Sequence, residues 1–291
     1  MFVGGRCEDA DVSAIVFALT ASIIWGWADF LGGLYSRRMS ALLVLLIGQS
    51  VGLVGALGIA LALGVEAPDL RGIAGGVLAG AGTAVGLAAF YRALAVGTMS
   101  IVAPISALGA AVPVLVGFGL GESPSPVQGA GMAVAIAGVV LASRSSDGAH
   151  AGGSGGSGGV GLALLSALAI GFGLVGLDVA AESGVLWSVI TTRAVAALLL
   201  ALALAGTSAG RSLARRDLVS LALIGCLDAA AVGLLAQATT TGLVGVVSVL
   251  GSLYPVTTVV LAQLVLRERI SRVQALGVAT ALAGVLLIAA G

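Results

Sequence analysis

The sequence contains no lysine, one histidine and few charges of any kind: only 9% of its 291 residues are charged. Soluble domains carry roughly 25% charged residues. Hydrophobic residues make up 59% of the chain and the mean hydropathy is +1.18, so the composition predicts a protein whose solvent is lipid. Thirteen arginines balance thirteen acidic residues. Because there is no basic excess, we expect no binding of nucleic acid.

The scarce residue types also argue against an enzyme. Without lysine there is no Gly-rich phosphate-binding loop that ends in Lys. His150 lies in a Gly/Ser-rich segment, which excludes a histidine-based metal site or catalytic triad within the apolar segments. Cys7 lies in a polar tail and Cys226 in an apolar run, which is typical of neither a disulfide framework nor a metal site. We therefore expect no metal, no cofactor and no enzymatic activity.

Long apolar runs dominate what remains. A bilayer core about 30 Å thick needs about 20 apolar residues per helix, and a chain in lipid must satisfy its own backbone hydrogen bonds. The acidic N-terminus lacks the basic region of a cleavable signal, so we expect the first run to stay in the mature protein. The sequence predicts an all-α, multi-pass protein of the cell membrane with ten transmembrane helices. They are residues 12–35, 41–63, 73–96, 101–120, 127–142, 160–181, 186–205, 218–236, 244–266 and 273–290.

The ten runs form two copies of a five-helix unit. The units are residues 12–142 and 160–290, joined by a Gly/Ser-rich linker at residues 143–159. Four matched pairs are each displaced by 146 residues, namely Glu122 and Glu268, Gln128 and Gln274, Gly131 and Gly277, and Gly138 and Gly284. Five is an odd number of crossings, so the second copy starts from the opposite side of the membrane. The pattern predicts inverted repeats.

These residues resemble a known family. A Pro-containing helix, a break with Glu, a Gln six residues after that Glu and a closing Gly-Val-x-Leu helix occur twice, and they resemble the EamA repeat of the drug/metabolite transporter superfamily. The segment Trp25-Gly26-Trp27 is similar to the Trp-Gly stretch of that family's first helix. The resemblance covers essentially the whole chain. It implies a secondary transporter of a small organic metabolite, with both termini in the cytoplasm.

Ionisable residues inside the predicted spans are candidates for function, because a charge at the centre of a membrane helix costs several kcal/mol. Asp228 lies near the middle of its helix. It is expected to line a transport cavity and bind a substrate cation or a coupling proton, or alternatively to form a structural pair with an arginine. Asp178 and Arg193 lie on either side of a short loop, so they either pair across that hairpin or join the cavity.

Other polar and aromatic residues could complete the cavity. Arg92 either lines it or extends to the membrane interface. The further candidates are Trp25, Asp29, Tyr91, Gln237 and Tyr254. Pro113 and Pro255 fall at matched positions in the middle of the fourth and ninth predicted helices. A proline bends a helix because it removes a hydrogen bond, so the pair either forms two hinges on which the halves rock or marks static bends.

The arginines outside the spans gather in one set of loops. Those after the first, fifth, seventh and ninth predicted helices hold Arg37, Arg38, Arg144, Arg211, Arg215, Arg216, Arg267, Arg269 and Arg272. The opposite set holds Arg6 and Arg71. The positive-inside rule then places the termini outside the cytoplasm, opposite to what the resemblance implies.

The sequence as a whole favours a carrier for an amino acid, sugar, nucleoside or drug-like solute, working by alternating access. The alternatives are a membrane-embedded lipid-modifying enzyme or lipid-binding scaffold, and a channel.

Overall fold

The computed structural model describes residues 4–65, 67–121, 125–142, 156–207, 215–241, 250–251 and 253–290. All regular secondary structure within these ranges is helical. The helices are α1 (Gly4–Ser36), α2 (Ala41–Leu63), α3 (Leu70–Val96), α4 (Met99–Ser106), the 3₁₀-helix η1 (Ala107–Ala110), α5 (Ala111–Gly119), α6 (Pro126–Ala142), α7 (Gly156–Ala181), α8 (Val185–Ala205), α9 (Arg215–Thr241), α11 (Tyr254–Val265) and α12 (Arg272–Ala290).

Seven segments of the described chain are long and apolar enough to cross a membrane. They lie in α1, α2, α3, the run from α4 to α5, α7, α8 and α9. Three shorter apolar helices lie in α6, α11 and α12. The protein is therefore a multi-pass membrane protein. The predicted helix at residues 244–266 is seen mainly as α11, because residues 242–249 and 252 lie outside the described residues.

The two matched prolines differ in their place along the helix. The fourth predicted helix is divided into α4, η1 and α5, and Pro113 lies in α5. A proline cannot bond to the carbonyl four residues before it, which here is Gly109 in η1, so the 3₁₀ turn lies where the α-helical bond is missing. Pro255 instead lies in the first turn of α11, where its missing N–H costs nothing. The prediction that Pro255 lies in the middle of a helix is therefore wrong for α11 as described.

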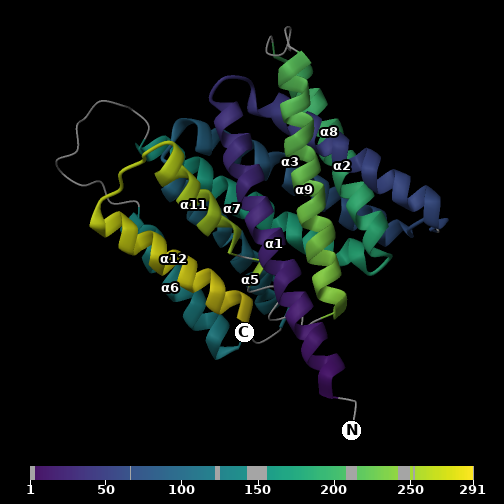
Figure 1. Cartoon of the computed structure of the whole chain (residues 1–291), viewed down its shortest axis with the longest axis horizontal. Coiled ribbons are helices and arrows are strands. Elements are labelled where there is room, and N and C mark those ends of the chain that lie inside the picture. The colour runs from purple at the N-terminus through teal and green to yellow at the C-terminus, as the bar shows by residue number, and fades with distance from the viewer. Residues whose placement is uncertain are drawn as a thin grey trace.

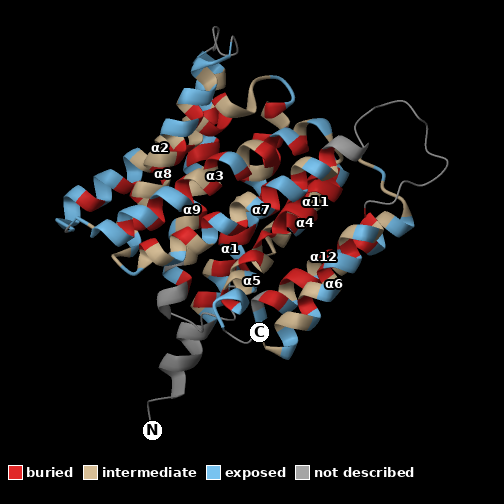
Figure 2. Ribbon diagram, turned by 180° about the vertical axis from the view of Figure 1, so that it is seen from behind, coloured by how far each residue is buried: buried red, intermediate tan, exposed pale blue. Residues whose placement is uncertain are grey.

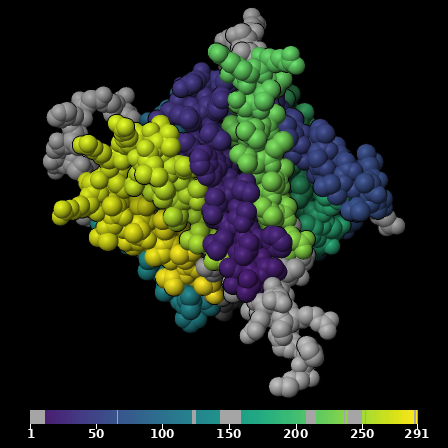
Figure 3. Space-filling view, in the orientation of Figure 1, coloured from purple at the N-terminus to yellow at the C-terminus, as the bar shows by residue number. Residues whose placement is uncertain are grey.

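The two halves interlock through reciprocal helix pairs. The α1 helix packs on α9 and α11, while α7 packs on α3 and α4. The second helices, α2 and α8, pack on each other, and so do the last helices, α6 and α12. Figure 1 shows α6 and α12 together at one edge of the molecule and α2 and α8 at the opposite edge. The space-filling view shows α1 lying along α9 across one face (Figure 3).

Burial is concentrated between these outer pairs. Every residue of α4 is buried, and Figure 2 shows buried residues gathered around α3, α4 and α7 while the outer helices expose much of their length. Leu61, at 83% exposure, and Leu202, at 61%, lie on α2 and α8. Such large exposed apolar side chains suit helices whose outer faces contact lipid tails.

Glycines allow α6 and α12 to approach closely. A Cβ atom on Gly138 would lie 2.6 Å from the Cα of Ala281, and one on Gly277 would lie 2.7 Å from the Cα of Ala142. Gly138 contacts the carbonyl of Gly277. Gly284, which is the equivalent of Gly138 in the second repeat, contacts Gly131 through its own carbonyl. These small residues form the antiparallel α6–α12 seam.

The starts of α6 and α12 carry the same cap. Ser125 N–H donates to Gln128 Oε1 (3.0 Å) while Gln128 N–H donates to Ser125 Oγ (3.1 Å). Ser271 and Gln274 make the same two bonds at 3.0 and 3.2 Å. This reciprocal pattern is a capping box, which satisfies two otherwise unpaired donors of a helix start. The matched Gln residues of the sequence thus have the same structural role in both copies.

Polar contacts also tie loops together at each end of the helices. At one end Arg71 pairs with Glu182 (2.9 Å) and Ser183 Oγ donates to Asp69. That hydroxyl, together with the N–H of Gly72, holds the pKa of Asp69 below its ordinary value, because both donors favour the carboxylate. The connections before α3 and after α7 therefore meet on one side, as the count of crossings predicts.

Candidate functional site

An ion pair lies where α1, α2, α8 and α9 meet. Asp228, on α9, accepts a hydrogen bond from Arg193 of α8 at 2.8 Å through Oδ2. Its other oxygen, Oδ1, accepts from the indole Nε1 of Trp25 on α1 at 2.9 Å. Both carboxylate oxygens of Asp228 are thus engaged. The hairpin pairing of Arg193 with Asp178 is wrong, and Asp228 has the arginine partner that was the alternative for it.

The α2 helix holds the guanidinium of Arg193 in place. Gln49 Oε1 accepts from Arg193 Nη1 at 3.4 Å. Gly52, one turn further on, lies directly against the guanidinium, so that a Cβ there would be 2.6 Å from Arg193 Cζ. The side chain of Arg193 is 8% exposed. A charge this well buried needs its counter-charge, and removal of one partner of such a pair typically costs about 3–5 kcal/mol.

Aromatic side chains from both halves flank the pair. The rings of Trp25 and Tyr254 meet edge to face, with centroids 6.2 Å apart. The α11 helix lies tightly on α1 at this point, because Thr258 Oγ1 donates to the carbonyl of Gly26 at 3.2 Å. A Cβ on Gly26 would lie 2.6 Å from the carbonyl oxygen of Tyr254. The absence of a side chain at Gly26 therefore lets Tyr254 approach Trp25.

One face of α1 carries the site. Trp25, Asp29 and Gly32 recur at spacings of four and three residues, which places them on one side of a helix. Tyr91 of α3 packs with its ring over Gly32. Asp29 is close enough to Asp228, Tyr91 and Tyr254 to interact with them electrostatically. The structure thus gathers six of the nine predicted cavity residues, and Arg193 is one of them.

The remaining three candidates lie elsewhere. Arg92 on α3 and Asp178 on α7 are exposed. Gln237 is exposed on α9, about two and a half turns beyond Asp228. The exposed position of Arg92 agrees with the alternative in which its side chain extends toward the membrane interface.

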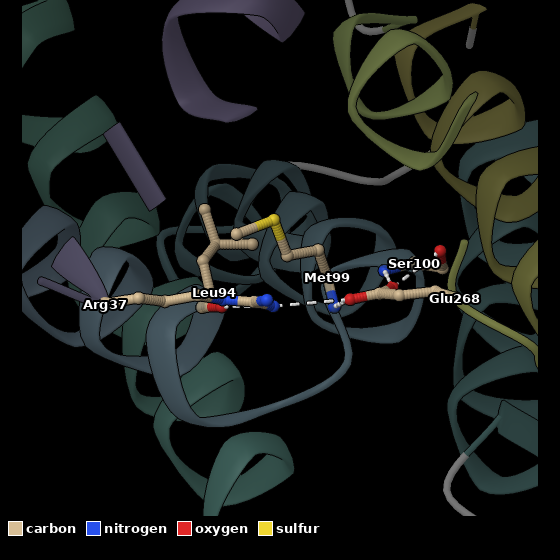
Figure 4. A network of polar contacts seen from close by, with 5 residues as sticks. All are labelled: Arg37, Leu94, Met99, Ser100 and Glu268. Carbon is tan, nitrogen blue, oxygen red and sulfur yellow. Dashed lines mark hydrogen bonds and ion pairs between the residues drawn. The ribbon is translucent and has the colours of Figure 1, made fainter. Parts of the chain in front are cut away.

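A second polar network lies at the end of the molecule opposite Asp69. Glu268, between α11 and α12, accepts from the backbone N–H of Met99 (3.0 Å) and from the N–H and hydroxyl of Ser100 (3.0 and 2.9 Å). It also pairs with Arg37 (3.4 Å), just after α1, and Arg37 contacts the carbonyl of Leu94 at 3.5 Å. Figure 4 shows Arg37 and Glu268 pointing toward each other from opposite sides of the α4 start.

Comparison with known proteins decides the family. The sequence model described as the EamA-like transporter family matches residues 12–144 and 157–290. The chain belongs to this family. No curated protein matches. A solved structure titled "Crystal structure of protein" is similar over 95% of this chain and 96% of its own length, with a TM-score of 0.61 and 19% identity. At that identity the likeness concerns the fold alone.

The site also contains residues that the sequence pattern did not indicate as functional. Gln49 and Gly52 are uncharged residues of a long apolar run, and nothing in their spacing marks them as partners of a distant arginine. The sequence marks Glu268 as a residue that recurs in both repeats, but it indicates no contact partner for it. Its position in a break between helices, at a spacing matched by Glu122, was the available signal; Glu122 itself lies outside the described residues.

Proposed function

We propose that this protein is a ten-helix secondary transporter of the cell membrane that moves a small organic solute, such as an amino acid, sugar, nucleoside or drug-like molecule. Its two five-helix halves are inverted and work by alternating access. The observation that carries the proposal is a polar site built from both halves within an apolar molecule: Trp25 and Gln49 come from the first repeat, and Arg193, Asp228 and Tyr254 from the second.

The reciprocal packing supports the inversion. The first helix of each half packs on the third helix of the other, α1 on α9 and α7 on α3. The second and fifth helices pack on their own counterparts. A two-fold relation between halves requires reciprocal contacts of this kind. The antiparallel α6–α12 seam, in which Gly131 lies against Gly284 and Gly138 against Gly277, fits an axis perpendicular to these helices, and hence in the membrane plane.

The position of the ion pair supports a transport role for the site. Asp228 lies near the middle of α9, at the depth where inverted-repeat carriers bind substrate. Asp228 is 32% exposed while Arg193 is 8% exposed, so the carboxylate side of the pair is the more open one. Rocking of the halves would change contacts between α1 and α9 and between α2 and α8, which together hold this pair. Energy would come from a gradient of solute or ions.

Gly52 offers a sharp test with a matched control. In Gly52→Ala the new methyl group displaces the guanidinium of Arg193, whereas a Cβ added at Gly55, on the same helix, would have nothing within 4 Å. Uptake into proteoliposomes would be measured for a panel of amino acids, sugars, nucleosides and cationic amines, with and without a pH gradient. We expect Gly52→Ala to lower saturable uptake by about tenfold or more, equivalent to about 1.4 kcal/mol, and Gly55→Ala to match the wild type.

Two results would contradict the proposal. If Gly52→Ala, Gly55→Ala and Asp228→Asn all took up solute as well as the wild type does, the ion pair would not take part in transport. Flux that rises linearly with solute concentration would indicate a channel, because a carrier saturates when its site is filled.

A further inference from the structure

The positive and negative charges of the ionisable side chains at the site do not cancel. Beyond their first turns, the described membrane spans hold five Asp and Arg residues, namely Asp29, Arg92, Asp178, Arg193 and Asp228. Arg92 and Asp178 are exposed away from the site. Of the three that remain, Arg193 and Asp228 neutralise each other at 2.8 Å. The site therefore has a formal charge of minus one when its carboxylates are ionised, and that charge belongs to Asp29.

The contacts of α1 locate Asp29 inside the site. Its neighbours one turn away on the same helix face are Trp25, which donates to Asp228, and Gly32, on which the ring of Tyr91 lies. Asp29 interacts electrostatically with Asp228, Tyr91 and Tyr254. The charged and titratable groups that face it are thus one carboxylate on α9, already paired with Arg193 of α8, and two phenols on α3 and α11.

We propose that the transported solute is a monovalent organic cation with an apolar or aromatic body, and that the Asp29 carboxylate binds its charged group. This inference rests on the proposed transport function. An apolar environment disfavours a carboxylate that lacks a counter-charge, so Asp29 favours a solute that brings one positive charge and disfavours an anion. Aromatic rings on several sides, Trp25, Tyr91 and Tyr254, add the ring faces and edges that favour organic ammonium groups over hydrated metal ions.

The paired charges disfavour the other solute classes. A carboxylate on the solute would have to displace Asp228 from Arg193, whose guanidinium is also held by Gln49 and by the close approach of Gly52. A neutral solute supplies no counter-charge and so gains little from the Asp29 carboxylate beyond a hydrogen bond. The arrangement therefore selects for one positive charge rather than for a zwitterion or a neutral molecule.

The test uses solutes that share one body and differ in charge. Binding to the purified full-length protein in lipid nanodiscs would be measured by calorimetry at pH 7 for phenethylammonium, phenethyl alcohol, phenylalanine and 3-phenylpropionate. We expect the cation to bind at least about tenfold more tightly than the other three, as an ion pair shielded from water allows. Asp29→Asn should remove that preference while leaving the weak affinity for phenethyl alcohol unchanged.

Asp178→Asn is the matched control, because it removes an exposed carboxylate from another span, and it should keep the preference. Retention of the preference in Asp29→Asn, tighter binding of the zwitterion or the anion, or the absence of any preference for the cation in the wild type would overturn the inference. The wild-type comparison stands even where a variant fails to fold. Binding of the cation without uptake would refute the transport function alone, whereas saturable uptake of a zwitterion only would refute this inference alone.

Discussion

Replacement of Glu268 should destabilise the protein more than replacement of Arg37, the arginine with which it pairs. The carboxylate accepts two backbone N–H groups and one hydroxyl at the start of α4 and pairs with Arg37. Each such hydrogen bond contributes about 1 kcal/mol, and an N-terminal cap is worth about 0.5–2 kcal/mol. Glu268→Ala should therefore cost about 3 kcal/mol. Glu268→Gln keeps one accepting oxygen and should cost about half as much.

The contribution of Arg37 should be small. The Arg37 guanidinium lies 3.4 Å from the Glu268 carboxylate, and the side chain of Arg37 is 31% exposed. Partly exposed ion pairs contribute about 0–1 kcal/mol to the free energy of unfolding. Arg37→Ala should thus cost less than about 1 kcal/mol, and Glu182→Ala, which removes the exposed pair at the other end of the helices, should cost less still. Reversible unfolding by SDS titration in mixed micelles would rank these variants. Equal stability of Glu268→Ala and the wild type, or equal losses from Glu268→Ala and Arg37→Ala, would refute the capping argument.

Two further predictions concern the α6–α12 seam and the Asp69 loop. Gly138→Ala and Gly284→Ala, at equivalent positions of the two repeats, should each destabilise the protein by about 1–3 kcal/mol, because the added methyl meets backbone atoms of the facing helix. Gly129→Ala, where a Cβ has nothing within 4 Å, should not, and unequal losses from the first two variants would contradict the reciprocal packing. A lowered pKa of Asp69 means that its contribution to stability is present above the ordinary pKa, about 3.9, and is lost as pH falls through the lower folded value. Ser183→Ala should raise that pKa and so remove part of this contribution, which makes the variant less stable than the wild type at pH 6, with a difference in melting temperature that shrinks as the pH falls toward 3; identical pH profiles between pH 6 and pH 3 would exclude the bond.

The sequence was most informative where local chemistry repeats. Apolar length gave the spans of α2 and α8 almost to the residue, and Gln128 and Gln274, matched by position, make the same capping box. Pro255 was misplaced because a proline predicts a bend inside a helix and a helix start equally well when the preceding residues are apolar.

The polar site was harder to predict because its partners are distant in the chain. Trp25 and Asp228 are 203 residues apart, and Gln49 and Arg193 are 144 apart. The loop between Asp178 and Arg193 suggested the nearer pair, since a short connection favours contact. The two residues lie on helix faces that do not meet, because Arg193 faces Gly52 of α2 whereas Asp178 is exposed on α7.

The scaffold is duplicated but the charges at the site are not. Capping boxes and seam glycines occur in both halves with a displacement of 146 residues. At the displacement of 145 that relates Gly26 to Gly171, Arg193 corresponds to Gly48 and Asp228 to Thr83. A two-fold site would present two equal sets of charges to a small solute that has no such symmetry. Confining Arg193 and Asp228 to one half removes that redundancy. In the proposed transport cycle, the symmetric helices would then exchange their packing while the solute meets one distinct arrangement of charge.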